Sequence, residues 1–201
     1  MFSTTERGEK MSLFGEIKEK IGKMPTGEVV TVSDFKNIAS EKTVSKILER
    51  LTGTNCIEKV IRGIFWIPKK DSSPAPLGVA NALARANNWS VSPSGEAAVY
   101  LFGLSDTPPR EWQFVTDGTY RCYHYGEHTL TFCHTSGKLI SEMSSQTALL
   151  LQVLRFYGKE YMPAALLEKI RLYSDREWKK ILAETKNATA WMAQSLRRIR
   201  I

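Results

Sequence analysis

The sequence has few of the features that mark a membrane protein or a disulfide-rich secreted protein. No run of about 18 apolar residues occurs in its 201 residues, so no membrane span is expected. Three cysteines at unrelated spacings do not form a disulfide framework, and the polar N-terminus lacks the apolar core of a signal peptide. Because 42% of the residues are hydrophobic and 24% are charged, we expect a globular protein of the reducing cytoplasm.

The sequence also lacks the motifs of the common enzyme classes. It contains no Walker loop and no GxSxG elbow. Gly103-Leu-Ser105-Asp106 resembles the beginning of a nucleotidyltransferase motif, but the paired carboxylates that would hold magnesium are missing. We therefore expect a protein that binds a partner rather than catalyses a reaction, and we expect no cofactor. The alternative, an enzyme acting through the C-terminal half, would require metal-dependent or nucleotide-dependent turnover.

One short segment is rich in residues that can ligate zinc: Cys122, His124, His128, Cys133 and His134. A two-residue turn at Gly126-Glu127 would place Cys122, His124 and Cys133 on one face of a hairpin and the two remaining histidines on the other. Because four ligands cannot converge from opposite faces, we expect no metal site.

Positive charge is concentrated at the two ends of the chain, whose net charge is +7. Residues 1–70 carry 13 Lys and Arg against 9 Asp and Glu, and residues 186–201 carry four basic residues and no acid. Such an excess suits a polyanion, because each neutralised phosphate releases condensed counterions. A soluble protein that is merely basic remains the alternative on charge alone.

Residues 33–68 have the pattern of a helix, a turn, a second helix and a β-hairpin. Ser33 is the expected N-cap of a short helix with Phe35 and Ile38 facing inward, and Ser40 is the expected N-cap of the next. The second helix carries an apolar stripe at helical spacing: Val44, Ile47, Leu48 and Leu51. Residues 56–61 and 64–67 then alternate around a tight Arg62-Gly63 turn, closed by Pro68. A row at Leu13, Ile17 and Ile21 predicts a preceding helix, and residues 28–32 predict a short third strand. This order is the layout of a winged helix-turn-helix, which predicts a DNA-binding module.

The recognition helix would begin at Ser40, and its N-terminal half would meet base edges in the major groove. Arg50, one turn too deep for bases, would touch the DNA backbone or pair with Glu49 or Asp34. Gly63 would let Arg62 project toward the minor groove or its phosphates. The predicted DNA-binding residues are Lys42, Thr43, Ser45, Lys46, Arg50, Lys59, Arg62 and Gly63.

Residues 69–77 form the one clear linker, because Lys, Ser and Pro in succession favour an extended spacer. The boundary there predicts a winged-helix domain at residues 1–70 and a second domain at residues 76–201. The second domain is expected to have a short antiparallel sheet, including a hairpin at Asp117-Gly118, followed by helices that include one capped by Ser174. The predicted fold class is therefore α+β.

The last expected helix carries Arg197, Arg198 and Arg200 opposite an apolar face that includes Trp191 and Leu196. It forms either a second phosphate-contacting patch or a solvated, frayed tail.

Several segments together resemble the AbiEi-type antitoxin family of type IV toxin–antitoxin systems, and closely its small bacterial relatives of uncharacterised function. These segments are residues 33–35, 44–51, 57–68, 92–95, 101–105, 116–118 and 190–192. The resemblance implies an N-terminal winged helix that binds and represses the promoter of its own operon. It also implies a C-terminal domain that opposes a nucleotidyltransferase-like toxin without stable binding. Its DNA-binding positions correspond here to the exposed face of residues 40–50 and to Arg62-Gly63.

Two other kinds of function fit the same pattern. The winged helix could serve a stand-alone transcriptional regulator without a toxin partner. It could also be a scaffold for a protein–protein adaptor, which would form a stable stoichiometric complex and retain no DNA at low salt.

Overall fold

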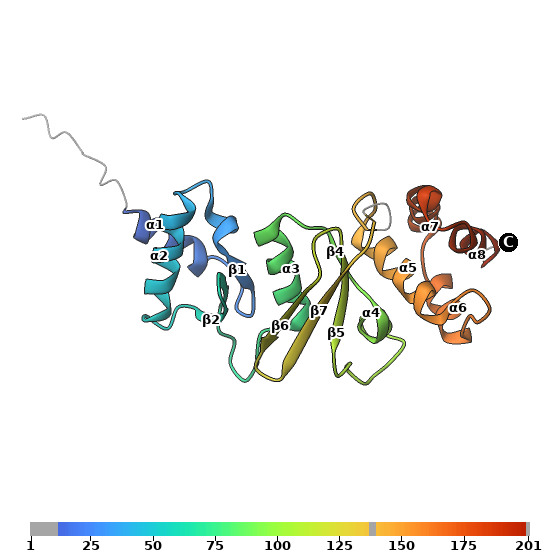
Figure 1. The fold of residues 1–201 in the computed structure, drawn as a ribbon, viewed down its shortest axis with the longest axis horizontal. Helices are drawn as coiled ribbons and strands as arrows, with labels where there is room; N and C mark the ends of the chain where they lie inside the picture. Colours follow the sequence, from blue (N-terminus) through green and yellow to red (C-terminus); the bar gives the residue numbers. More distant parts are fainter. Residues whose placement is uncertain (1–11, 137–139, 200–201) are drawn as a thin grey trace, which may run out of the picture. The chain divides into compact units, whose positions relative to one another are not determined.

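The computed structural model describes residues 12–136 and 140–199 and has the predicted α+β architecture. Within these ranges it contains eight α-helices and two small sheets (Figure 1). The chain divides into two compact units, Met1–Ala86 and Asn87–Ile201. None of the helices in the described ranges has both the length and the apolar character needed to cross a membrane.

The first unit combines three α-helices, one short 3₁₀-helix and a three-stranded sheet. In chain order its elements are α1 (Leu13–Gly22), β1 (Val29–Thr31), η1 (Val32–Phe35), α2 (Glu41–Thr52), β2 (Glu58–Ile61), β3 (Ile64–Trp66) and α3 (Pro76–Asn87). The sheet is antiparallel with β3 between β1 and β2. The predicted hairpin and its third strand are therefore both present.

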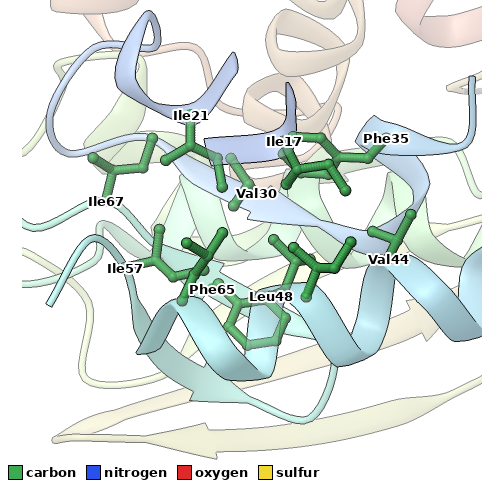
Figure 2. Close-up of a cluster of buried hydrophobic side chains, with 11 residues drawn as sticks. Ile17, Ile21, Val30, Phe35, Val44, Leu48, Ile57, Phe65 and Ile67 are labelled. Atoms are coloured by element: carbon green, nitrogen blue, oxygen red, sulfur yellow. The ribbon is translucent and has the colours of Figure 1, made fainter. Parts of the chain in front are cut away.

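The core of the first unit is built on the apolar stripe predicted for α2. All four residues of that stripe are buried, at positions 44, 47, 48 and 51. They pack against a cluster drawn from the other elements, which contains Ile17, Ile21, Val30, Phe35, Ile57, Phe65 and Ile67 (Figure 2). Because this side of α2 is occupied by the core, its opposite side faces outward.

The two predicted helix caps of the first unit have different outcomes. Ser40 is the N-cap of α2, since its Oγ accepts a hydrogen bond from the backbone N–H of Thr43 at 3.4 Å. The prediction for Ser33 is wrong, because η1 begins at Val32 and Thr31 occupies the N-cap position. There the carboxylate of Asp34 accepts the N–H of Thr31 at 2.9 Å, so the chain turns directly out of β1.

The position of α3 differs from the expected domain boundary. Residues 67–75 form neither helix nor strand, which agrees with a linker, but the compact units divide after α3, at Ala86. A Cβ added at Gly78 of α3 would lie 3.3 Å from Cγ2 of Val29 in β1. Arg85, near the end of α3, also hydrogen-bonds residues of the first unit. These contacts explain why α3 belongs with the first unit rather than the second.

The second unit combines a four-stranded sheet with five α-helices in the described residues. Its elements are β4 (Val91–Pro93), α4 (Gly95–Leu101), β5 (Trp112–Thr116), β6 (Arg121–Tyr125), β7 (His128–His134), α5 (Ser145–Tyr157), α6 (Ala164–Arg171), α7 (Asp175–Glu184), η3 (Thr185–Asn187) and α8 (Ala190–Ile199). As predicted, Ser174 caps α7, with a capping box to Glu177. Helices α5 to α8 enclose a core that includes Leu151, Trp178 and Leu196.

The predicted hairpin at Asp117-Gly118 is wrong. The strand order is β4-β5-β7-β6, so β5 pairs in parallel with β7 and has no pairing with β6. The segment instead holds the start of β4, because Asp117 Oδ1 accepts the N–H of Ser90 at 2.8 Å. A Cβ at Gly118 would lie 2.3 Å from the indole of Trp89, so only a glycine permits this approach. The sheet is therefore mixed, not wholly antiparallel as expected.

Candidate nucleic-acid interface

The outward face of α2 carries the two lysines predicted to meet DNA. Lys42 and Lys46 are exposed and lie four residues apart, so they share one face of the helix. Ser45 is partly exposed between them. Thr43 is also partly exposed, but its Oγ1 lies 3.0 Å from Ser40 Oγ and its N–H is the one that Ser40 caps. Thr43 therefore completes the N-terminus of the helix, while both lysines project freely.

Lys59 and Glu49 tie the hairpin to this face of α2. Lys59 Nζ in β2 lies 2.8 Å from Glu49 Oε1, and both side chains are about half exposed. Glu49 is seven residues after Lys42, which places it in the same row along the helix. The ion pair therefore positions β2 beside the C-terminal end of the lysine row. It also occupies the charge of Lys59, which sequence reasoning assigned to a phosphate.

Neither of the two ion pairs expected for Arg50 is formed in the described part of the chain, and its expected contact with the DNA backbone stays a prediction. Glu49 pairs with Lys59, and Asp34 pairs with Arg85. The Arg50 guanidinium lies instead over the ring of Phe14 in α1, 4.8 Å from the ring centroid. This contact holds the end of α2 against α1, and Arg50 remains an exposed residue.

The hairpin ends in the predicted Arg62-Gly63 turn. Gly63 has a φ of +78°, a left-handed conformation that favours glycine. A Cβ there would meet open space, so the requirement comes from the backbone and not from packing. Arg62 is exposed at the tip of the turn.

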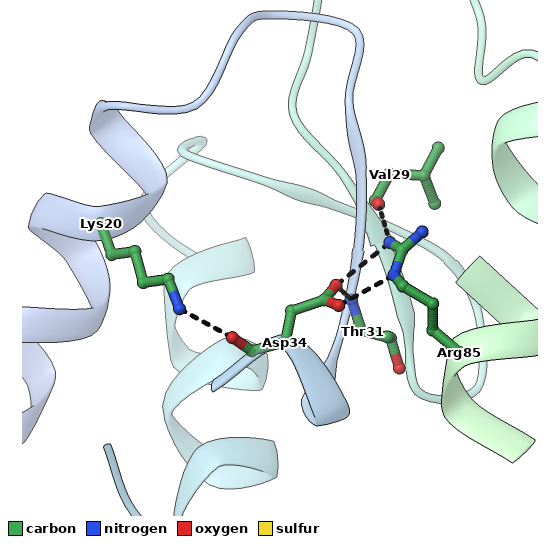
Figure 3. A network of polar contacts seen from close by, with 5 residues as sticks. All are labelled: Lys20, Val29, Thr31, Asp34 and Arg85. Carbon is green, nitrogen blue, oxygen red and sulfur yellow. Dashed lines mark hydrogen bonds and ion pairs between the residues drawn. The ribbon is translucent and has the colours of Figure 1, made fainter. Parts of the chain in front are cut away.

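Asp34 joins three elements of the first unit behind this face (Figure 3). Its carboxylate accepts hydrogen bonds from Arg85 Nε at 2.9 Å and Nη2 at 3.2 Å, as well as from the N–H of Thr31. Arg85 Nη2 also donates to the carbonyl of Val29 at 2.9 Å, and Lys20 Nζ donates to the carbonyl of Asp34 at 2.7 Å. The turn that precedes α2 is thus bound to α1, β1 and α3 at once.

Sequence reasoning missed the role of Asp34 in this network. Arg85 is 51 residues away in the chain, so no local spacing pointed to the pair. The one available signal was an acid three residues after a Thr, which is the capping-box pattern.

The basic helix at the C-terminus belongs to the second unit. Arg197 and Arg198 are exposed in the last turn of α8, while Met192 and Leu196 are buried. Arg200 lies outside the described residues. Through Ile199 the segment is a helix packed by one face, and its two described arginines point outward.

The Cys- and His-rich hairpin has the predicted distribution of side chains. Cys122 lies opposite Thr131 and His124 opposite Thr129, so these share a face with Cys133, two residues from Thr131. His128 and His134 fall on the other face. Among the described residues, no group of three or more His, Cys, Asp or Glu side chains could hold a metal ion.

Comparison with protein-family models relates most of the chain to one family. A family model described as a family of unknown function, DUF6088, matches residues 16–182. A search of curated proteins finds no match.

Proposed function

The chain belongs to the DUF6088 family, whose function is unknown, and we propose that it is a winged-helix repressor that binds the promoter of its own operon. In this proposal α2 is the recognition helix and the β2–β3 hairpin is the wing. The observations that carry the proposal are the exposed lysine row of α2 and the exposed arginine at the hairpin tip of the same unit.

The arrangement of these cations suits one stretch of duplex DNA. A helix in the major groove presents the N-terminal part of its outer face to base edges, which is where Lys42 and Lys46 lie. Lys46 can donate to guanine acceptors or to a phosphate. Since Glu49 and Lys59 hold β2 beside the same face, the hairpin can follow the adjacent strand, with Arg62 at its phosphates or minor groove.

The Asp34 network fixes the turn that leads into the recognition helix. Base readout depends on a fixed angle between a helix and the rest of its domain, because hydrogen bonds weaken steeply with misalignment. Asp34 lies in the turn six residues before the N-cap of α2 and is bonded to Arg85 and Thr31. Side-chain hydrogen bonds to α3 and β1 therefore hold this turn in place, in addition to its own backbone.

A triple substitution tests the DNA-binding proposal. Lys42→Gln, Lys46→Gln and Arg62→Gln together should lower affinity for DNA from the region upstream of the gene by about 100-fold or more. They should also reduce the slope of log K against log salt by about two to three units, since each lost phosphate contact removes about 0.9. Gel shifts and fluorescence anisotropy at several salt concentrations measure both effects.

A control with the same loss of charge makes this test specific. Lys159→Gln, Arg176→Gln and Lys179→Gln are all exposed positions of the second unit and should leave affinity nearly unchanged. If both triple variants lost the same amount of DNA affinity, the loss would reflect the lower net charge and not the positions of the three cations in the first unit. Undiminished binding by the first variant at physiological salt would refute the proposal. A stable stoichiometric protein complex with no DNA retention at low salt would favour the adaptor function instead.

We also propose, from the resemblance to AbiEi-type antitoxins, that the second unit opposes a nucleotidyltransferase-like toxin encoded beside this gene. Co-expression with the neighbouring gene should restore growth that the neighbour alone arrests. The second unit alone, from Asn87, should restore growth as well as the full chain does. Continued arrest with both proteins present at equal levels would contradict the antitoxin role while leaving DNA binding untouched.

A further inference from the structure

Two neighbouring cavities in the second unit share one exposed aromatic ring. The smaller, of about 270 Å³, is lined by residues that include Ser94, His134, Gln152, Arg155 and Phe156. The larger, of about 560 Å³, is lined by Glu96, Ser105, Thr107, Arg110 and again Phe156. Together they have the size of a site for a small organic ligand.

The smaller cavity lies where the parallel pair of strands ends. Val115 of β5 and His134 of β7 line it, and β5 and β7 run in the same direction with Thr116 opposite His134. The carboxyl ends of parallel strands are where open sheets flanked by helices bind ligands, because the helices and loops diverge there. Helices α4 and α5 both lie on one side of this sheet (Figure 1), and residues of each line the cavity.

Gln152 supplies a polar group that lacks a partner in the described part of the chain. Its side chain lines the smaller cavity from α5, although the residue is only 3% exposed. No hydrogen bond to its carboxamide is formed by residues 12–136 or 140–199. A ligand in the cavity that offers a donor and an acceptor can therefore bond to this amide, which has both an N–H and a carbonyl group to present.

Arg155 places a positive charge at the same cavity, and His134 adds a ring nitrogen that can orient a ligand. Arg155, one turn from Gln152, is exposed and presents a guanidinium suited to bidentate binding of phosphate. His134 Nδ1 lies 2.7 Å from the carbonyl oxygen of Gly118. A carbonyl only accepts, so Nδ1 carries the hydrogen in this contact, and Nε2 is the ring nitrogen left for a ligand hydroxyl.

Phe156 provides a flat apolar surface between the two cavities. Its side chain is 46% exposed, although it is a large apolar group. The neighbouring ring of Tyr157 is nearly perpendicular to it, with centroids 5.2 Å apart and an interplanar angle of 86°, so Tyr157 is not stacked in parallel on Phe156.

We propose that these two cavities bind a free nucleotide. Arg155 holds the phosphate in the smaller cavity, Gln152 and His134 bond its polar neighbours, and the base stacks on Phe156 with its edge toward Glu96 and Arg110. A phosphate alone would leave the aromatic surface uncovered, and a base alone would leave the guanidinium unpaired. This site does not depend on DNA binding by the first unit.

Calorimetric titration of the full chain tests this inference. The probes are the four ribonucleoside 5′-monophosphates, the four matching nucleosides and inorganic phosphate. At least one monophosphate should bind about tenfold or more tightly than either its nucleoside or phosphate alone.

Single substitutions locate the site. Arg155→Gln and Phe156→Ala, both at exposed positions, should each weaken nucleotide binding by about tenfold or more. Gln152→Leu keeps the volume of the buried side chain and should also abolish binding while the far-ultraviolet spectrum stays unchanged. Arg176→Gln, an exposed arginine of α7 outside both cavities, is the matched control and should bind normally.

Three results would overturn the proposal. The first is no binding of any monophosphate at millimolar concentration. The second is that inorganic phosphate binds as tightly as the nucleotides do, which would mean that the cavities form a simple anion site. The third is a nucleotide affinity that Arg155→Gln and Phe156→Ala do not change. None of these results bears on promoter binding by the first unit.

Discussion

The first turns of α2 and α5 are held in place in different ways. Ser40 caps α2 from the adjacent position in the chain. The first turn of α5 is capped from a distance, because Glu184 of α7 accepts hydrogen bonds from the backbone N–H of Ser144 at 3.1 Å, its hydroxyl at 2.7 Å, and the hydroxyl of Thr147. The start of α2 is therefore specified by neighbouring residues, and the start of α5 by a residue far away in the sequence.

The largest expected effect comes from a long-range contact of the second unit. Gly118→Ala would place a methyl group 2.3 Å from the Trp89 indole, whose ring also packs against Phe132 with centroids 6.2 Å apart. Because neither ring can move without losing that packing, we expect a loss of about 3 kcal/mol in unfolding free energy. Urea titration followed by circular dichroism measures it.

Gly22→Ala is the matched control in the first unit. It lies at the end of α1, and a Cβ there would meet nothing within 4 Å. Alanine should therefore be neutral, or stabilise by up to about 1 kcal/mol. Equal effects of the two alanines would contradict the close approach of Trp89 to Gly118.

The second expected effect tests a long-range polar network of the first unit, formed by Asp34 and Arg85. Asp34→Ala removes the partner of Arg85 and the acceptor of the Thr31 N–H. The Asp34 side chain is 18% exposed and that of Arg85 44%, so water partly screens the pair and we expect a loss of about 2 kcal/mol. Hydrogen exchange should show faster opening around η1. Asp106→Ala, at an exposed position, should change stability by less than about 0.5 kcal/mol.

Prediction from the sequence succeeded where a feature depends on neighbouring residues and failed where it depends on distant ones. Most of residues 33–68 was predictable, apart from the cap expected at Ser33, because the Ser40 cap, the apolar stripe of α2 and the tight turn each need only neighbours in the chain. The parallel pairing of β5 with β7 was not, since the turn signal at Asp117-Gly118 says nothing about which strand lies beside β5. The hairpin of β6 and β7 was predicted with the right faces, again because its turn is local.

The residues of the candidate interface were likewise predictable only where local spacing determines their positions. Helical spacing alone predicts that Lys42 and Lys46 share an exposed face, and the structure has them there. The ion pair of Lys59 with Glu49 depends on how the hairpin lies over α2, and the position of Arg50 depends on where α1 places Phe14. Neither relation can be read from spacing.

The third expected effect is a pH-dependent one at Glu184. Burial opposes ionisation of this carboxyl, but hydrogen bonds from Thr147 and Ser144 and the charge of Lys180 together hold its pKa below the ordinary value. Its contribution to stability is therefore fully present above the ordinary carboxyl pKa and is lost as the pH falls through the lowered one.

Glu184→Gln should cost about 1.5 kcal/mol at neutral pH, because an amide accepts more weakly than a carboxylate. The gap between this variant and the natural protein should narrow as the pH is lowered from about 5 toward about 2. Urea midpoints at both ends of that range measure it, with Glu168→Gln, at an exposed position of α6, as the control. A gap that stays constant with pH would show that Glu184 acts by packing and not by its charge.

The smallest expected effect separates the true cap of the first unit from the false one. Ser40→Ala removes the hydroxyl that accepts the N–H of Thr43 and should cost about 1 kcal/mol. Ser33→Ala should cost less than about 0.5 kcal/mol, because Thr31 and Asp34 form the start of η1 and Ser33 lies inside it. Both variants remove one serine hydroxyl from the same unit, so their difference in urea midpoint isolates the capping bond. If Ser33→Ala proved the more costly, the turn before α2 would begin at Ser33, and the Asp34–Thr31 bond would not be what starts it.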